Sequence, residues 1–145
     1  MRLLRRRRLP PELRDAFQAF RTVVALVERA KDALTAAVPS TRTAGLPLPD
    51  ALSDFEEDLR RARGRMSGWR RPEVEASWLA CASAIDEALA SAERLRVEAP
   101  RIAGFEGVIG ALDGLLAPLD RFDEGFAAFR AARVIPPKSN GRSTD

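Results

Sequence analysis

Residues 72–95, PEVEASWLACASAIDEALASAERL, carry the clearest periodicity in the chain. Apolar residues recur there at alternating steps of four and three, which keeps one side of an α-helix apolar. The members of this stripe are Val74, Trp78, Cys81, Ile85, Ala88, Ala92 and Leu95. Charged and hydroxyl side chains occupy the other side. The pattern predicts one long amphipathic helix at the centre of a helical bundle.

Two further predicted helices precede this one. The first begins after Pro10, because proline suits the first turn of a helix, and it ends at Pro39. The second covers residues 49–66 and is acidic in its first half and basic in its second, as the helix dipole prefers. Two ion pairs with the favourable four-residue spacing are expected in it: Glu56–Arg60 and Glu57–Arg61.

A fourth helix is predicted over residues 102–133, with Pro118 inside it. Proline removes a backbone hydrogen bond, so this helix should kink. The apolar stripe agrees, because it should continue at Asp123 but resumes one position earlier, at Phe122. Up to the proline, the expected core positions are Ile102, Phe105, Ile109, Leu112, Leu116 and Leu119.

Four amphipathic helices with mostly short connections predict an all-α, antiparallel up-down four-helix bundle. We expect the last helix to be kinked at Pro118 or, as the alternative, split into two helices there. The chain of 145 residues is then one bundle domain over residues 10–134. A basic N-terminal arm at 1–9 and a disordered tail at 135–145 flank it.

The residue inventory disfavours catalysis. Histidine is absent, which excludes Cys–His and Ser–His pairs and the usual di-iron bundle motif, and no phosphate-binding loop is present. The single cysteine, Cys81, lies on the apolar stripe and is expected to be buried and structural. We therefore predict no catalytic residue, cofactor or metal site. The weak alternative is a Mg²⁺ site made of carboxylates alone, or a carboxylate-dependent enzyme. The candidate carboxylates, Glu56, Glu57 and Asp58, are more simply explained as a cluster on the helix surface.

Neither export nor membrane insertion is indicated. The start MRLLRRRRLPPEL has no apolar core of the kind found in signal peptides, so we expect a cytoplasmic protein. The most apolar stretch, residues 102–119, is borderline short for a transmembrane span. It also contains Glu106 and Asp113, which are costly in a bilayer, so no transmembrane segment is predicted.

Positive charge is concentrated at the chain ends. The net charge is +3, but seven of the 24 basic residues and one of the 21 acidic residues lie in the first eight and last eight positions, which leaves 17 basic against 20 acidic residues between them. In an up-down bundle, arginines from several helix ends would also meet at one pole. The candidate anion-binding set is Arg5, Arg6, Arg7, Arg8, Arg63, Arg65, Trp69, Arg70 and Arg71. Arginine and an aromatic ring suit nucleic acid or an anionic membrane surface, whereas solvated helix ends are the alternative.

Small residues form a second candidate site. Ala103, Gly107, Gly110 and Gly114 recur at helical spacing. Each glycine inside a helix costs about 1 kcal/mol relative to alanine, so a packing reason is expected. Small residues let another backbone approach closely. They predict a helix-packing interface, either with another copy of the chain or within the same monomer. The other alternative is a long helix that tolerates its glycines.

The function expected from the sequence is therefore a non-catalytic interaction or scaffolding protein. Its partner would be another protein or a second copy, docked on the last helix. The alternative is an anion-binding module that uses the arginine-rich pole to bind nucleic acid or a membrane surface.

Overall fold

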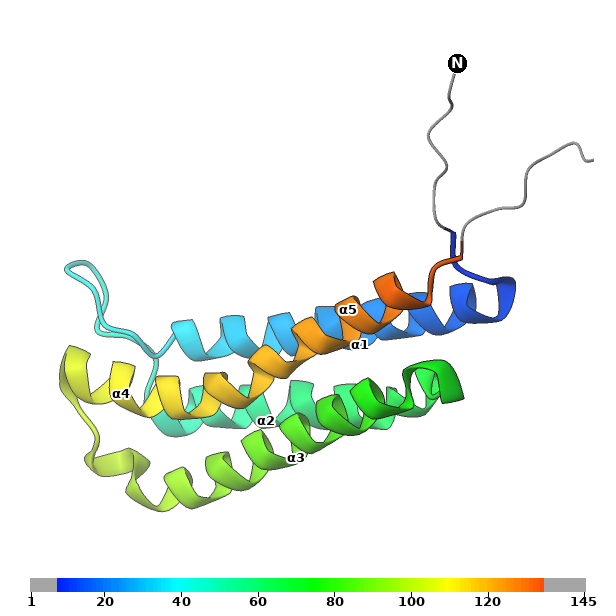
Figure 1. The fold of residues 1–145 in the computed structure, drawn as a ribbon. Helices are drawn as coiled ribbons and strands as arrows, with labels where there is room; N and C mark the ends of the chain where they lie inside the picture. The colour runs from blue at the N-terminus through cyan, green and yellow to red at the C-terminus, as the bar shows by residue number, and fades with distance from the viewer. Residues whose placement is uncertain (1–7, 135–145) are drawn as a thin grey trace, which may run out of the picture.

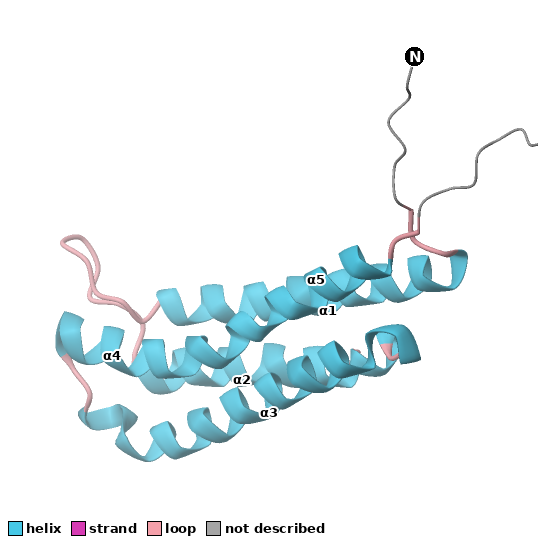
Figure 2. Ribbon diagram, viewed as in Figure 1, coloured by secondary structure: helices cyan, strands magenta, loops and turns pink. Residues whose placement is uncertain are grey.

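The computed structural model describes residues 8–134, and every regular element in that range is helical (Figure 1, Figure 2). The longer helices are α1 (Pro11–Thr35), α2 (Leu48–Gly64), α3 (Glu75–Glu98), α4 (Gly104–Leu116) and α5 (Phe122–Ala132). Short 3₁₀ turns link them: η1 (Met66–Trp69), η2 (Pro72–Val74), η3 (Ala99–Arg101) and η4 (Ala117–Arg121). Residues 1–7 of the predicted arm and the predicted tail at 135–145 lie outside the described range.

Proline residues set several of these boundaries. Pro11 begins α1 and Pro49 lies in the first turn of α2, where a missing N–H costs nothing. Pro72 opens η2, so the central helix starts with a 3₁₀ turn and becomes α-helical only at residue 75. Pro118 lies in η4, which interrupts the α-helical hydrogen bonding between α4 and α5. The fourth predicted helix is therefore an arm of two α-helices joined by a 3₁₀ segment.

The helices pack in a closed circuit around one core. α1 packs on α2, α2 on α3, and α3 on α4, η4 and α5, while α5 returns to α1. Figure 1 shows the α4–η4–α5 arm crossing the front of the molecule, with the loop between α1 and α2 beside the start of α4 at one end. The first and last described residues lie together at the opposite end, where Arg8 and Val134 exchange backbone hydrogen bonds of 2.7 Å.

Aromatic rings fill the half of the core near the chain ends. Phe20 of α1 lies 4.7 Å from Trp69 and 5.4 Å from Phe129, measured between ring centroids. Trp69 and Phe129 are 5.8 Å apart. All three side chains are buried. These edge-on and tilted contacts hold α1, η1 and α5 together.

The predicted stripe of the fourth helix is confirmed at Leu112 and Leu119, which are buried, but Ile109 and Leu116 are only partly buried and one further position is exposed. Phe105, expected in the core, is 53% exposed. The side of α4 that packs inward carries Val108, Leu112 and Leu115 instead. This difference arises because contacts with α3 fix the rotation of α4, and they leave Phe105, at the first turn, on the edge of the buried face.

Candidate functional site

The small-residue face of α4 is exposed. Ala103, Gly107, Gly110 and Gly114 all lie at the surface. A β-carbon built at Gly110 or Gly114 would meet no neighbouring atom within 4 Å, and one at Gly107 would meet a single methyl group of Ile102 at 3.5 Å. Close packing within the monomer therefore does not explain these three glycines. The face is available to another molecule.

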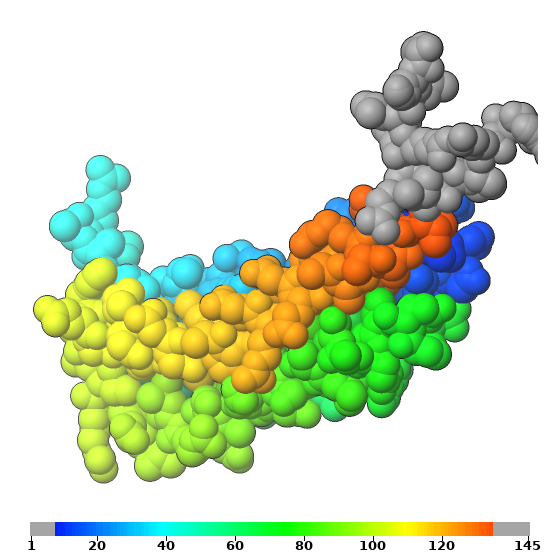
Figure 3. Space-filling model, in the orientation of Figure 1, coloured from blue at the N-terminus to red at the C-terminus, as the bar shows by residue number. Residues whose placement is uncertain are grey.

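Partly exposed apolar side chains lie on another side of α4. Phe105, Ile109 and Leu116 share an edge roughly opposite the glycines. Glu106 and Asp113 lie between that edge and the glycine face. Figure 3 shows the arm that begins with α4 as a ridge across the front of the molecule, with the end of α3 below it. The glycine face and this apolar edge are therefore separate surfaces of α4.

A shallow groove follows the other side of α4. Its volume is about 320 Å³. Leu95 of α3 and Ala111, Gly114 and Leu115 of α4 provide apolar and small lining residues. Ser91, Arg94 and Glu98 of α3 complete the lining. Gly114 contributes to both the exposed face and the groove, so the two features are continuous.

The arginine-rich pole is only partly assembled as predicted. Arg5, Arg6 and Arg7 lie outside the described residues. Arg8 is fixed by its bridge to Val134, and Arg71 donates to the backbone oxygen of Glu12 at 3.3 Å. These contacts place both residues near the start of α1. Arg65 is exposed at the end of α2.

Two other arginines of the predicted set are engaged within the protein. Arg63 pairs with Asp86 at 3.0 Å. Arg70 forms a two-pronged pair with Glu75, at 3.1 and 2.6 Å, and its guanidinium lies 4.0 Å from the Trp78 ring centroid. The hydrogen bond from Arg70 lowers the pKa of Glu75 and raises the pKa of Arg70. Much of the positive charge at this pole is therefore neutralised locally.

Trp69 is not part of an anion-binding surface, contrary to the prediction. Its side chain is fully buried, and its indole nitrogen donates to the sulfur of Met66 at 3.3 Å. The ring is packed against Phe20 and Phe129, so no face of it is free to stack on a base. The sequence placed this tryptophan among arginines, but η1 turns the side chain inward.

The acidic cluster of α2 is also placed differently from the prediction. Glu56 and Asp58 are buried rather than on the surface, and Glu57 is exposed. The Glu56 side chain pairs with Arg96 of α3. This contact could not be predicted from the sequence, because the two residues are 40 positions apart. The two predicted pairs within α2 are confirmed, with Arg60–Glu56 at 4.0 Å and Arg61–Glu57 at 2.6 Å.

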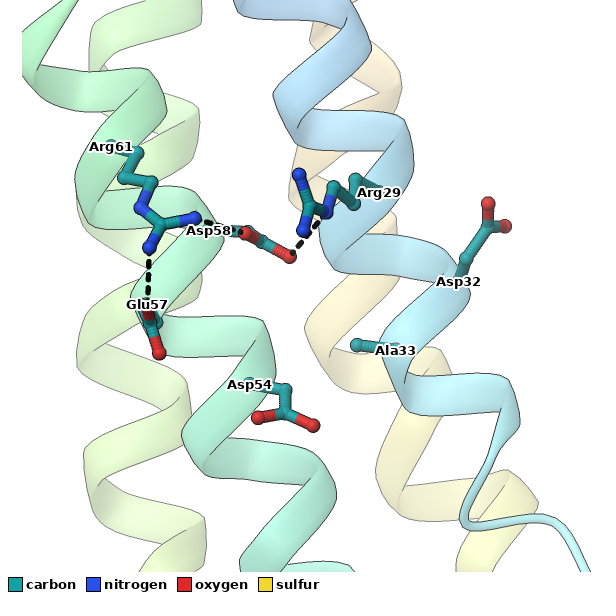
Figure 4. Close-up of a pocket in the computed structure, with 7 residues that line it drawn as sticks. All are labelled: Arg29, Asp32, Ala33, Asp54, Glu57, Asp58 and Arg61. Atoms are coloured by element: carbon teal, nitrogen blue, oxygen red, sulfur yellow. Dashed lines mark hydrogen bonds and ion pairs between the residues drawn. The ribbon is translucent and has the colours of Figure 1, made fainter.

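Asp58 lies in a polar groove between α1 and α2 (Figure 4). The groove has a volume of about 500 Å³. The carboxylate of Asp58 is only 10% exposed and lies between Arg29, at 3.8 Å, and Arg61, at 3.6 Å. Opposite charges from both helices therefore compensate the buried carboxylate. The arrangement links α1 to α2 and is better suited to a structural role than to holding a cation.

Within residues 8–134, no cluster of three or more Asp, Glu or Cys side chains has the placement needed to hold a metal ion. Cys81 is buried, as predicted, and burial raises the pKa of its thiol to about 12. No helix in the described part of the chain is both long and apolar enough to cross a membrane. No protein-family model, curated protein or solved structure gives a significant match to this chain.

Proposed function

We propose that this protein is a non-catalytic interaction protein, an antiparallel up-down bundle that self-associates by docking a second copy on the exposed face of α4. The observation that carries this proposal is the open space around Gly110 and Gly114. The two glycines lie mid-helix, yet nothing in the monomer requires them to lack a side chain.

The energetics support a partner. Gly107, Gly110 and Gly114 together cost about 3 kcal/mol of helix stability relative to alanine. A contact in which another chain approaches the backbone of α4 would use the missing side chains.

Molecular mass in solution tests this proposal. We expect sedimentation equilibrium to show a mass above the 15.9 kDa monomer at high concentration. Gly110→Leu should lower the association constant at least about tenfold, because a leucine there keeps the second chain away. Gly64→Leu, also in open space but at the end of α2, is the matched control. A wild-type monomer at all concentrations, or equal association of the Gly110→Leu variant, would reject the proposal.

A second candidate function is anion binding at the arginine-rich pole. The observation favouring it is the Arg8–Val134 bridge, which holds Arg8 next to the end of the chain that carries Arg133, while Arg71 contacts Glu12 close by. Such a cluster would bind phosphate groups of nucleic acid or of an anionic membrane surface.

Retention on heparin and on DNA at low and high salt tests the second candidate. Removal of residues 2–7 together with Arg71→Gln should abolish salt-sensitive retention. Arg63→Gln should have little effect, because that guanidinium is already paired with Asp86. Unchanged retention of the first variant would exclude this function.

A further inference from the structure

α4 has the composition of a weak helix. It contains four glycines in 13 residues, whereas α1 and α3 contain none. Gly107, Gly110 and Gly114 lie inside the helix, and glycine disfavours the helical state because it leaves the unfolded backbone freer than alanine does. Three such positions within about two turns give α4 a low intrinsic tendency to stay helical.

Few contacts compensate for this weakness. Three residues of α4 are buried, Val108, Leu112 and Leu115, against eight of the 17 residues in α2. Glu106 and Asp113, the charged side chains of α4, form no ion pair with any residue in the described range 8–134. The apolar contacts of three side chains therefore provide most of the attachment of α4 to the bundle.

The packing beneath the start of α4 is incomplete. A cavity of about 210 Å³ lies between the start of α4 and the loop that joins α1 to α2. Val108 lines this cavity together with Ala37 and Leu48, and all the other lining residues are also apolar. Side chains that face a cavity lack part of the contacts of a close-packed interior. Val108, one of the three buried residues of α4, is therefore held less firmly than a fully packed core residue.

Breaks in the α-helical backbone bound α4 on both sides. Gly104 begins the helix with a φ of 80°, a conformation that other residues rarely adopt. At the other end, Pro118 lies in η4, where α-helical hydrogen bonding stops. Unfolding of α4 need not spread into α3 or α5, because no continuous α-helix connects it to either of them.

We propose that α4 opens as a unit while α1, α2, α3 and α5 remain folded. Segments of this kind open at a lower free energy than the whole protein. The opening exposes Val108, Leu112 and Leu115 and uncovers the part of the core against which they pack, including Leu48, which lines the cavity beside Val108. α4 thus controls access to an apolar surface at one end of the bundle (Figure 1). The opening is a property of the single chain, so this inference goes beyond docking of a second copy and does not depend on it.

Native-state hydrogen exchange tests this inference on the monomer. Amides of α4 should be at least about tenfold less protected than the slowest amides of α1 and α3. Gly110→Ala should raise the protection of α4 about fivefold, because alanine favours the helix and position 110 is open. Arg96→Ala should lower protection in α2 and α3 but leave that of α4 unchanged, because the pair of Arg96 with Glu56 of α2 stays intact when α4 opens.

Two results of this experiment would overturn the inference. Protection of α4 equal to that of α1 and α3 would mean that α4 opens only when the whole protein unfolds. A loss of α4 protection in Arg96→Ala by the same factor as in α3 would mean the same. A concentration series separates the inference from the proposed function, because docking should raise the protection of α4 with concentration, whereas opening of the single chain is independent of it.

Thiol labelling gives a second readout. In a Cys81→Ala background, Val108→Cys places a thiol on the buried side of α4, and Val27→Cys places one in α1 as the control, both at buried positions. A thiol reagent should label position 108 at least about tenfold faster than position 27, and Gly110→Ala should slow labelling at 108 about fivefold. Equal rates at the two positions, in variants that circular dichroism shows to be folded, would contradict the opening of α4.

Discussion

The ring of Phe20 on α1 occupies the space in which Gly125 on α5 would carry a side chain. A β-carbon at position 125 would stand 2.5 Å from Cε1 of Phe20 and 2.6 Å from Cζ. Phe20 is itself held by Trp69 and Phe126, whose ring centroids lie 4.7 and 4.8 Å from its own. The missing side chain at Gly125 is thus what lets α5 close over α1.

Gly125→Ala should destabilise the protein by about 1–3 kcal/mol, because the added methyl group overpacks a rigid aromatic cluster. The loss should be visible as a lower Tm in thermal denaturation followed by circular dichroism. Gly110→Ala makes the same chemical change in open space and should be neutral or stabilising by up to about 1 kcal/mol. Equal effects of the two substitutions would contradict the packing described for Phe20.

The pair between the buried carboxylate of Glu56 and the partly exposed Arg96 should be an important contact between α2 and α3. Arg96→Ala leaves a carboxylate that is only 5% exposed without its main partner and should cost about 1–3 kcal/mol. Arg60→Ala, which removes a largely exposed guanidinium 4.0 Å from the same carboxylate, should cost at most about 0.5 kcal/mol. Urea denaturation measures both.

The double variant Glu56→Leu/Arg96→Leu supplies the control for this pair. It removes both charges and should recover most of the stability lost in Arg96→Ala. If Arg96→Ala proves no more costly than Arg60→Ala, the pair contributes little and α2 and α3 are held by their apolar contacts alone.

The raised pKa of the buried Cys81 thiol leads us to expect a loss of stability at alkaline pH. Burial, and next the charge of Glu124, raise the pKa of its thiol from 9.0 to about 12, while its S–H donates to the backbone oxygen of Arg121 at 3.6 Å. Above pH 9 the unfolded chain loses this proton and the folded protein keeps it. Below about pH 9, Cys81 makes its full contribution to the free energy of unfolding. As pH rises from about 9 toward 12, this contribution falls by about 1.4 kcal/mol per pH unit.

Cys81→Ala isolates this effect. The stability difference between wild type and the variant should shrink from pH 9 to pH 11 in chemical denaturation, and native wild type should react slowly with a thiol reagent at pH 8. A difference independent of pH, with rapid labelling, would show that the thiol is accessible in the folded protein.

Local sequence signals predicted the helices well because each depends on neighbouring residues. The periodicity of residues 72–95 and the prolines at positions 11, 72 and 118 act within one or two turns. The positions that the sequence placed wrongly are those fixed by contacts across the fold. Phe105 fits the stripe of its own helix, but α3 decides which side of α4 is buried.

In the candidate sites, too, local features were predicted correctly and features that depend on distant contacts were not. The spacing of Gly107, Gly110 and Gly114 was readable from the sequence, but whether the face was buried in the monomer depended on where α3 lies. Glu56 looks like a surface residue until Arg96, 40 positions away, is brought beside it. Trp69 lies among arginines in sequence, yet the turn at η1 buries its ring. Distant pairings of this kind leave no periodic signal in a single sequence.

The glycine amides provide the most direct test of docking on α4. Glycine signals occupy their own region of a ¹⁵N–¹H correlation spectrum, so a dilution series can follow each one. We predict that the signals of Gly107, Gly110 and Gly114 shift together with protein concentration, while those of Gly64, Gly68 and Gly125, away from α4, stay fixed. Shifts confined to Gly64 and Gly68, or no concentration dependence at any glycine, would contradict the account.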